Sequence, residues 1–392
     1  MPADDAGGVA GNGYTDTAIF QGAGVVDYEQ ALAILLRGVA RGDSETVASA
    51  EADGRVLAAD IVSPAALPRF DNAAMDGFAL ALRGRALAAG HELPVRGAIA
   101  AGVPAGEGGD GAWEIMTGAA LPAGLDTVVP VERVDAIAGE DAGAPPIGIR
   151  LRESPAPGAN VRRRGEDVGE GEPVLKASER LDSARLMLLA ALGVTRVPVV
   201  RRPRVALIAT GRELVDGGIA DGAGIHDSNT PFLRLRLRAA GAEVVMEERV
   251  ADDPVAFAAA LDRIRERGVD LVISTGAVSK GRFDFVPGSL RARGAELLFH
   301  GVGIRPGKPL LAARLPEGPL HVGLPGNPAS CAVGLRFFVE PVLRAMLGLP
   351  AERPLRLPLA GPAWRRPGLR THLHARVTCD ARGQLTVHPL PR

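Results

Sequence analysis

Short apolar runs alternate with amphipathic stretches along the second half of the chain, at 193–346. Runs rich in β-branched residues predict buried strands, and apolar residues spaced three and four apart predict helices that cover them. Because the two patterns alternate, we expect a doubly wound, mainly parallel α/β sheet domain. The expected strands are 205–209, 242–246, 271–274, 297–301 and 321–324, and the expected helices are 231–240, 254–267, 285–293 and 329–346.

The first half of the chain has a different pattern of predicted elements. Residues 26–39 predict a helix with Asp27 as its N-cap, 52–60 a second short helix, and 181–192 an amphipathic helix. Between these helices, a region rich in glycine and proline contains short β-like runs at 93–98, 113–116 and 127–131. The expected organisation is a flexible leader at 1–24, a discontinuous mixed helical N-terminal domain at 25–63 and 151–192, an inserted small β domain at 64–150, the α/β domain at 193–346 and a short C-terminal β domain at 347–392.

Length and composition narrow the class of protein. A chain of 392 residues is long enough for two to four domains, and a net charge of −1 gives no reason to expect nucleic acid or an anionic membrane as partner. Cys331 and Cys379 follow no metal-binding spacing and are interpreted as packing residues, typical of a reducing compartment. The first residues lack the features of a secretion signal, and no apolar run reaches membrane-spanning length. We therefore expect a cytoplasmic protein.

The stretch 269–284 carries the densest candidate chemistry. Its apolar start predicts a strand, and the small residues that follow allow a tight turn whose N–H groups can bind an anion. Asp284 then stands at the start of the next predicted helix, where a carboxylate either caps the helix or binds a metal ion. Taken by itself, this stretch is explained better by an ordinary β–α turn with a capping aspartate, and the candidate chemistry gains weight only from the other loops. The candidate ligands here are Ser274, Thr275, Gly276, Ser279, Lys280 and Asp284.

Other loops should reach the same place, because ligands of such sheets bind beyond the carboxyl ends of the strands. A set of acids, Glu213, Asp227 and Asp284, suits a hard cation such as Mg²⁺, whereas Ser279, Lys280, Lys308 and glycine amides suit phosphate or another oxyanion. The further residues expected at this edge are Thr210, Gly211, Pro325, Gly326, Asn327 and Pro328.

Two regions outside the α/β domain also hold polar residues in suggestive positions. Turns of the β domain carry Asp76 and Thr117, although Asx residues and glycine are common in any turn. Arg162, Arg163 and Arg164 stand beside two acids. They fit a clamp for phosphate or carboxylate, and they fit a solvated charge cluster as well.

Eight motifs together resemble the ordered motif series of the molybdopterin molybdenumtransferase family, also called the MoeA and gephyrin E-domain family. Each motif alone is common, but the set in one order is specific, and it covers roughly residues 25–350. The motifs are FDNAAMDGF, MTGAALPAGLDTVVPVE, NVRRRGEDV, ATGREL, DSN, STGAVSKGRFD, RPGKP and GLPGNPAS.

The resemblance implies an enzyme of molybdenum cofactor biosynthesis that inserts molybdenum from molybdate into adenylylated molybdopterin and releases AMP, with Mg²⁺ assisting. It implies a homodimer, formed through the N-terminal domain, whose active cleft lies between the α/β domain of one subunit and the β domain of the other. Contact with other molybdenum cofactor enzymes is implied as well. Carried over by motif, Asp76, Glu213, Asp284 and Lys308 are catalytic, Glu213, Asp227 and Asp284 bind Mg²⁺, and Thr117 and Arg305 join the edge residues in binding substrate.

Three departures from the family pattern leave an alternative open. Ala277 stands where the family turn has glycine, and its Cβ could block a left-handed backbone or the approach of an anion. His226 replaces a tyrosine, and the C-terminal β domain is shorter than the family's, which fits either a minimal or a truncated domain. The alternative is a non-catalytic molybdopterin-binding or scaffolding paralogue. A third reading, the related adenylyltransferase, lacks the inserted β domain and ranks lower.

Overall fold

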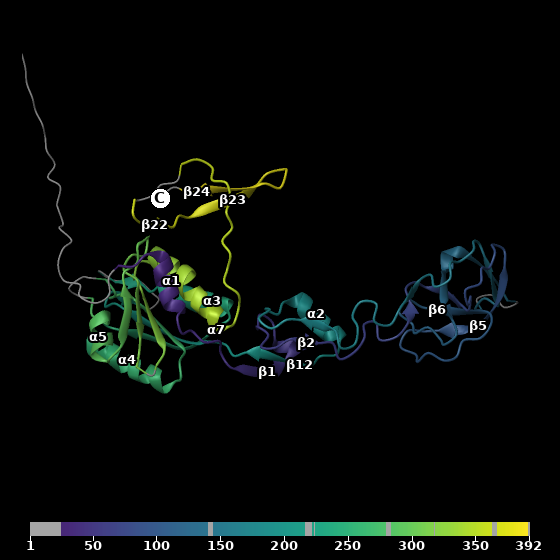
Figure 1. The fold of residues 1–392 in the computed structure, drawn as a ribbon, viewed down its shortest axis with the longest axis horizontal. Helices are drawn as coiled ribbons and strands as arrows, with labels where there is room; N and C mark the ends of the chain where they lie inside the picture. Colours follow the sequence, from purple (N-terminus) through teal and green to yellow (C-terminus); the bar gives the residue numbers. More distant parts are fainter. Residues whose placement is uncertain are drawn as a thin grey trace, which may run out of the picture. The chain divides into compact units, whose positions relative to one another are not determined.

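The computed structural model describes residues 25–139, 144–215, 222, 224–279, 284–316, 318–362 and 367–390. Contacts between Cα atoms divide the chain into two compact units (Figure 1). The first unit joins Met1–Asp43 with Arg201–Arg392, and the second is Ser44–Val200. No helix among the described residues is long and apolar enough to cross a membrane.

A six-stranded sheet forms the centre of the first unit, in the order β16-β13-β17-β21-β20-β18. The first four strands in this order run parallel, β20 is antiparallel to both its neighbours, and the sheet is therefore mixed but mainly parallel. The bounds are β13 Arg204–Thr210, β16 Glu243–Val250, β17 Leu271–Thr275, β18 Glu296–His300, β20 Leu311–Arg314 and β21 Leu320–Leu324.

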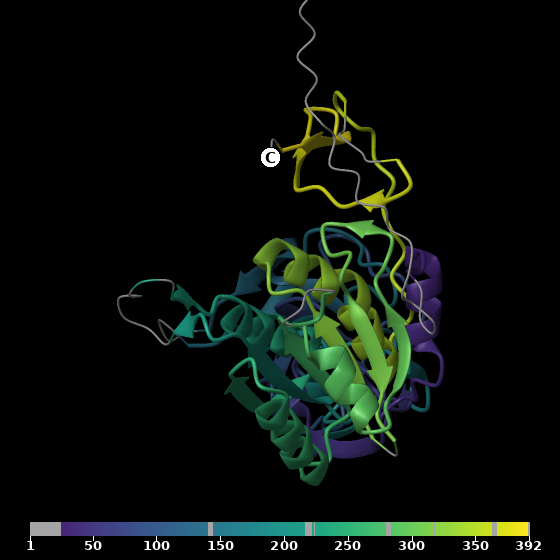
Figure 2. The same ribbon diagram turned by 90° about the vertical axis from the view of Figure 1, so that its left-hand side faces the viewer.

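Helices cover both faces of this sheet and create two cores. One core contains Leu35 of α1 and Leu237 of α3 together with residues of the helix that follows β21. The other contains Phe257 of α4 and Leu290 of α5. In Figure 1, α4 and α5 lie on one side of the sheet and α1, α3 and α7 on the other; Figure 2 turns the α4 and α5 side toward the viewer. The bounds are α1 Tyr28–Leu36, α3 Asn229–Ala240, α4 Pro254–Glu266, α5 Val286–Ala292, α6 Pro328–Gly334, η3 Leu335–Val339 (a π-helix) and α7 Glu340–Met346.

The second unit is built mainly of strands. Its largest sheet has the order β7-β4-β6-β5-β9-β8, and smaller two-stranded sheets pair β1 with β12, β2 with β11 and β3 with β10. The bounds are β1 Ser44–Ala48, η1 Ser49–Glu51, β2 Ile61–Val62, β3 Asn72–Ala73, β4 Gly77–Leu80, β5 Glu92–Ile99, β6 Ala112–Ile115, β7 Thr127–Pro130, η2 Val131–Arg133, β8 Val134–Ile137, β9 Gly148–Leu151, β10 Val161–Arg162, β11 Pro173–Leu175, α2 Ser183–Ala191 and β12 Arg196–Val200.

Short strands complete the first unit. They pair as β14 with β15, β19 with β22 and β23 with β24. Their bounds are β14 Leu214–Val215, β15 Ile225–His226, β19 Ile304–Arg305, β22 Arg370–Thr371, β23 Ala375–Cys379 and β24 Leu385–Pro389.

The predicted strands and helices of the α/β domain are all present, but two expectations need correction. β20 was not predicted, and its antiparallel direction makes the sheet mixed. The helix expected at 52–60 does not form. Ala52, Val56 and Leu57 are buried at helix-like spacing, but Val56 and Leu57 bridge to Arg180 and Val199, so tertiary pairing overrides the local pattern.

Two further expectations, on the first helix and on the two cysteines, agree with the structure only in part. Helix α1, expected in the N-terminal domain, begins at the predicted N-cap and packs into the core of the first unit. Asp27 and Gln30 there form a reciprocal capping box, which fixes the start of the helix. The predicted domain boundaries themselves stay predictions. Of the two cysteines, Cys331 is buried as expected, whereas Cys379 is exposed.

Candidate functional site

A cavity of about 410 Å³ lies at the carboxyl edge of the mixed sheet. It is enclosed by the segments that follow β13, β16, β17 and β21 and by the start of α3, in agreement with the position expected from the topology. Ten of the predicted residues line it: Thr210, Gly211, Glu213, Asp227, Thr275, Gly276, Asp284, Gly326, Asn327 and Pro328. We call this cavity the carboxyl-edge pocket.

The turn after β17 forms the floor of this pocket and requires glycine at Gly276. Gly276 has φ +86°, and a Cβ there would lie 2.6 Å from the carbonyl oxygen of Thr210. Its own N–H donates to the carbonyl of Leu324 at 3.1 Å, while Thr210 Oγ1 donates to the carbonyl of Thr275 at 2.9 Å. These two bonds tie β17 to its neighbours on both sides, so the turn is held rigidly.

Ala277 continues the same turn with φ +49°, in the left-handed region. Its carbonyl accepts a hydrogen bond from the N–H of Val286 at 3.3 Å, at the start of α5. A non-glycine residue in this region costs about 1–2 kcal/mol. The chain therefore keeps the left-handed turn despite the Cβ, whereas the effect of this Cβ on an approaching anion stays a prediction.

The starts of two helices bring further polar groups to the pocket. Asn327 caps α6, with Oδ1 accepting from the N–H of Ala329 at 3.1 Å. Asp227 Oδ1 accepts from the N–H of Thr230 at 3.0 Å near the start of α3. Asn229 Nδ2 donates to the carbonyl of Gly326 at 2.8 Å, which joins the two loops. Both helices therefore point their positive dipole ends toward the pocket.

Carboxylates dominate the charge of this pocket. Glu213, Asp227 and Asp284 were predicted, and Asp252, which follows β16, joins them. The strand-end rule that selected the other three would also have selected Asp252. In the part of the chain that the structure describes, no three His, Cys, Asp or Glu side chains come together as a metal-binding group. The expected Mg²⁺ cluster is thus not preformed among these residues.

Several predicted ligands do not line this pocket. Ser274 is fully buried one residue before the turn, and Pro325 is buried as well. Ser279 is exposed at the end of the described part of the turn, and Lys280 lies outside the described residues. Arg305 lines a different cavity, together with Thr371 and His372.

Lys308 also lies outside the lining of the carboxyl-edge pocket. It follows β18 and β19, and its backbone carbonyl accepts hydrogen bonds from Val302 and Leu310, each at 2.9 Å. These bonds fix the backbone of the loop before β20. A catalytic role for its ammonium group stays a prediction.

In the second unit, Asp76 and Thr117 contact each other across two turns. Asp76 Oδ1 accepts from the backbone N–H of Thr117 at 2.6 Å and from its hydroxyl at 2.9 Å. These hydrogen bonds, the backbone one first, lower the pKa of the Asp76 carboxyl below its ordinary value. Both side chains are exposed, so this pair forms a fixed, charged feature on the surface of the second unit.

The three consecutive arginines are each paired with a carboxylate of the same unit. Arg162 donates to Asp167, Arg163 to Asp71 at 2.7 Å and Arg164 to Glu170 at 2.7 Å. The geometry favours the solvated charge cluster over a ligand clamp, because the acids already occupy these guanidinium groups.

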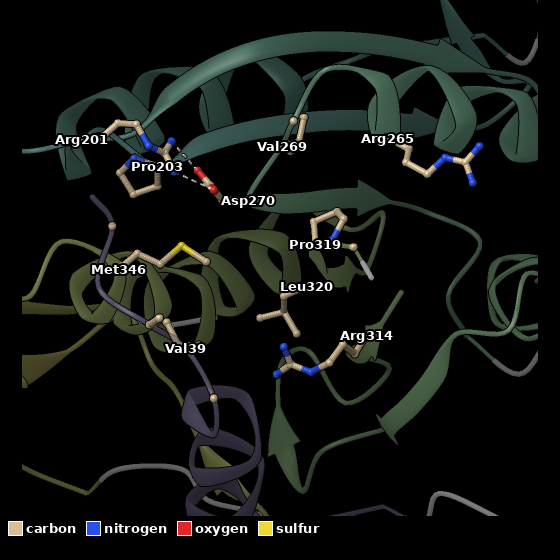
Figure 3. Close-up of a pocket in the computed structure, with 15 residues that line it drawn as sticks. Val39, Arg201, Pro203, Arg265, Val269, Asp270, Arg314, Pro319, Leu320 and Met346 are labelled. Atoms are coloured by element: carbon tan, nitrogen blue, oxygen red, sulfur yellow. Dashed lines mark hydrogen bonds and ion pairs between the residues drawn. The ribbon is translucent and has the colours of Figure 1, made fainter. Parts of the chain in front are cut away.

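A second cavity, of about 340 Å³, lies at the amino edge of the sheet (Figure 3). Arg201 pairs with Asp270 there through two hydrogen bonds of 2.9 and 3.0 Å. Val39, Leu320 and Met346 supply much of the remaining wall, and none of the predicted site residues lies here. We call this cavity the amino-edge pocket.

The chain has a mixed α/β sheet with a pocket at its carboxyl edge, lined by carboxylates and glycines, and a separate β-rich unit. These features define the class as a multi-domain α/β protein with a candidate ligand-binding site. Comparison with known families specifies it further. Residues 26–193 match the MoeA N-terminal region (domain I and II), and residues 206–345 match a probable molybdopterin binding domain. The chain belongs to the MoeA family of molybdopterin molybdenumtransferases.

Individual relatives agree with this family. The chain is 40% identical over 380 residues to a molybdopterin molybdenumtransferase of Synechococcus elongatus, covering 93% of this chain and 91% of that protein. It is 39% identical over 317 residues to molybdopterin molybdenumtransferase 2 of Mycobacterium tuberculosis, covering 78% and 76%. The crystal structure of the molybdopterin biosynthesis MoeA protein from Pyrococcus horikoshii OT3 superposes with a TM-score of 0.74 at 29% identity, covering 93% and 89%.

Proposed function

We propose that this chain is a molybdopterin molybdenumtransferase that inserts molybdenum from molybdate into adenylylated molybdopterin, with release of AMP and with Mg²⁺ assisting. The observation that carries the proposal is membership of the family over both matched regions, 26–193 and 206–345. The carboxyl-edge pocket supports it, because the molybdopterin-binding match contains all of its lining residues. Its volume of about 410 Å³ lies within the usual range for small-molecule sites.

In this proposal the turn at Thr275–Gly276 and the capped start of α6 bind the anionic part of the substrate. Backbone N–H groups in a tight turn and at a helix start favour negative charge. Ser279, Lys280, Arg305 and Lys308 are proposed to hold phosphate or molybdate oxygens from the adjoining loops. Since these groups stabilise charge that develops on the phosphoryl group, little covalent catalysis by the protein is needed.

The carboxylate oxygens of the carboxyl-edge pocket are of the kind that Mg²⁺ prefers. Glu213, Asp227 and Asp284 offer the oxygen ligands that a hard cation prefers, although Asp227 already accepts one backbone hydrogen bond. Mg²⁺ commonly binds through one or two carboxylates plus substrate phosphate, so a preformed cage of three is not required. When bound, the ion would neutralise charge on the phosphoryl group. The carboxylates orient it from the protein side.

We further propose a cytoplasmic homodimer in which the β domain of one subunit completes the cleft on the α/β domain of the other. The Asp76–Thr117 pair supports this assignment, because its fixed geometry and exposed carboxylate suit contact with a substrate. A molecular-mass measurement in solution tests the dimer. A monomer at assay concentrations that still turns over substrate would contradict a shared cleft.

One of the two grounds for the alternative of a non-catalytic paralogue, a distorted turn at Ala277, is not met, and the other, the short C-terminal domain, stays open. The alternative rested partly on a Cβ at Ala277 that would distort the turn, yet Ala277 takes φ +49° and the turn hydrogen bonds are in place. The four acids of the carboxyl-edge pocket also favour catalysis over scaffolding.

The decisive experiment measures AMP released from adenylylated molybdopterin with molybdate and Mg²⁺, for the native protein and for Asp284→Ala. We expect molybdate-dependent release that the variant loses. Glu266→Gln is the matched control, because Glu266 is an exposed acid at the amino edge, at the end of α4. A native protein that binds the adenylylated cofactor without releasing AMP would contradict the transferase and favour the scaffold.

A further inference from the structure

Two buried histidines contact the turn of the carboxyl-edge pocket from beneath, one at each end. His321 Nε2 lies 2.9 Å from the hydroxyl of Ser274, which directly precedes the turn. His300 Nε2 lies 2.7 Å from the carbonyl oxygen of Val278, near the end of the turn. The exposed fractions are 0% for His321 and 5% for His300, so neither ring can reach a ligand in the pocket. The two histidines come from different strands, β21 and β18.

The hydrogen-bond partner of His300 fixes the role of its ring. A carbonyl oxygen only accepts, so Nε2 of His300 carries a proton and donates to Val278. Burial lowers the pKa of His321 to about 3, which keeps this ring neutral. Its Nδ1 has no hydrogen-bond partner in the described chain. Its Nε2 shares a hydrogen bond with the Ser274 hydroxyl, which can donate or accept, so this bond forms with either ring tautomer.

Burying these rings is unfavourable unless their hydrogen bonds are used. A leucine or phenylalanine would bring no polar atom of its own into either space, whereas His321 leaves Nδ1 unsatisfied. Among the described residues, the His321 ring hydrogen-bonds to Ser274, and the ring of Phe257 packs edge-on against it with 6.1 Å between the ring centroids. The burial of His321 is therefore unfavourable in itself, and its hydrogen bond to Ser274 holds the start of the turn.

The end of the turn is restrained by packing as well. Val278 is 2% exposed, and its Cγ1 lies 2.7 Å from the point where a Cβ on Gly323 would stand. The side chain of Val278 thus fills the space left by a glycine of β21, while its carbonyl is held by His300. Ser279, the next residue, is exposed. Its direction is set by where Val278 is anchored.

We propose that His300 and His321 are positioning residues that hold the Thr275–Ser279 turn in the geometry needed for turnover. The inference rests on the proposed function, because the turn is assigned there to substrate binding. Neither histidine touches the substrate. A shift of about 1 Å in groups that orient a substrate can cost roughly a hundredfold in rate, so loss of either anchor should be visible in kinetics.

The test compares two kinds of substitution at each histidine. His300→Phe and His321→Leu remove the hydrogen-bonding ring nitrogen and are the donor-free variants, whereas His300→Gln and His321→Gln keep an amide, which can donate or accept, near the position of Nε2. We expect the first pair to lower kcat/KM for AMP release by about tenfold to a hundredfold, and the glutamine variants to restore most of that loss. Equal kcat/KM in the donor-free and native proteins, or no rescue by glutamine, would overturn the proposal.

A stability control separates positioning from simple loss of packing. Val205→Ala removes apolar volume from a fully buried site in β13, at the opposite end of the strand from the pocket. At a temperature where every variant is folded, it should keep native kcat/KM despite a lowered Tm. Loss of activity in Val205→Ala in proportion to its Tm would count against a positioning role.

A readout that does not depend on catalysis keeps this inference distinct from the proposed function. Amide hydrogen exchange of Gly276–Ser279 should be faster in His300→Phe and His321→Leu than in the native protein and slower again in the glutamine variants. If the native protein releases no AMP but the variants show these changes in amide exchange, the proposed transferase activity is refuted and the positioning role of the two histidines stands. Unchanged exchange in all variants would refute the anchoring.

Discussion

The two edges of one sheet carry cavities of similar size and opposite chemistry. The carboxyl-edge pocket, of about 410 Å³, is lined by acids, glycines and the starts of two helices. The amino-edge pocket, of about 340 Å³, is lined by arginines and apolar side chains (Figure 3). The arginines there act within the chain. Arg201 pairs with Asp270, and Arg314 donates to the carbonyl of Arg37. Arg204, which does not line the pocket, donates to the carbonyls of Arg267 and Gly268 at the same edge.

The comparison teaches that volume alone does not identify a functional site. Helices that run back along a parallel sheet end at its amino edge, so their last carbonyls collect there and attract arginines. The opposite edge collects helix starts, whose N–H groups and dipoles favour an anionic ligand. The direction of the chain therefore separates a structural edge from a ligand-binding edge. The following substitutions test that separation.

Gly276→Ala should have the largest effect. Its Cβ would meet Thr210 at 2.6 Å in a backbone of φ +86°, so we expect a loss of about 3 kcal/mol in the free energy of unfolding and at least a hundredfold or so in AMP release. The matched control at the amino edge is Gly268→Ala, where φ is +61° and nothing lies within 4 Å of the added Cβ. It should cost about 1 kcal/mol and leave turnover unchanged. Denaturant unfolding and the AMP assay measure both.

Acid should destabilise the first unit through His321. Its folded pKa of about 3 lies below the ordinary 6.5, so between these values the unfolded chain binds a proton that the folded chain does not. The free energy of unfolding should therefore fall as pH drops from 6.5 toward 3, because only the unfolded chain binds this proton in that range. Denaturant curves at several pH values check this. The slope should flatten in His321→Leu, and an unchanged slope would contradict the assignment.

Asp270→Asn should separate stability from activity at the amino edge. The substitution weakens the paired hydrogen bonds with Arg201 and the bond from the N–H of Arg204 at 2.7 Å. Since both side chains are about one-third exposed, we expect a loss of about 1–2 kcal/mol. AMP release by the folded variant should equal that of the native protein. A marked fall in kcat would mean that the two edges are not functionally separate.

Ala277→Gly should give the smallest effect, and a favourable one. Glycine takes the left-handed conformation of this turn without strain, so the variant should gain about 1 kcal/mol in the free energy of unfolding. AMP release should stay unchanged, because the turn already has this shape. Ala259→Gly, within α4, is the opposite control and should lose about 1 kcal/mol. A destabilised Ala277→Gly would contradict a strained turn.

Much of the α/β domain could be predicted because its patterns are local. Buried strands such as β17 read as continuous apolar runs, and capping residues such as Asp27 mark helix starts. β20 could not be predicted, since four residues carry little periodicity and an antiparallel strand breaks the regular alternation. The helix expected at 52–60 failed because its buried residues pair with strands distant in the sequence.

The sequence by itself determined which loops would meet at one edge, because parallel strands place their carboxyl ends together. It also determined the residue types there, and the motif series that assigns the chain to its family. Only the tertiary structure decided which side chains line the pocket. Neighbouring residues of a strand point to opposite sides, so Thr275 reaches the pocket while Ser274 turns inward to His321. Contacts between residues so distant along the chain, such as His300 with Val278, arise only when strands pack.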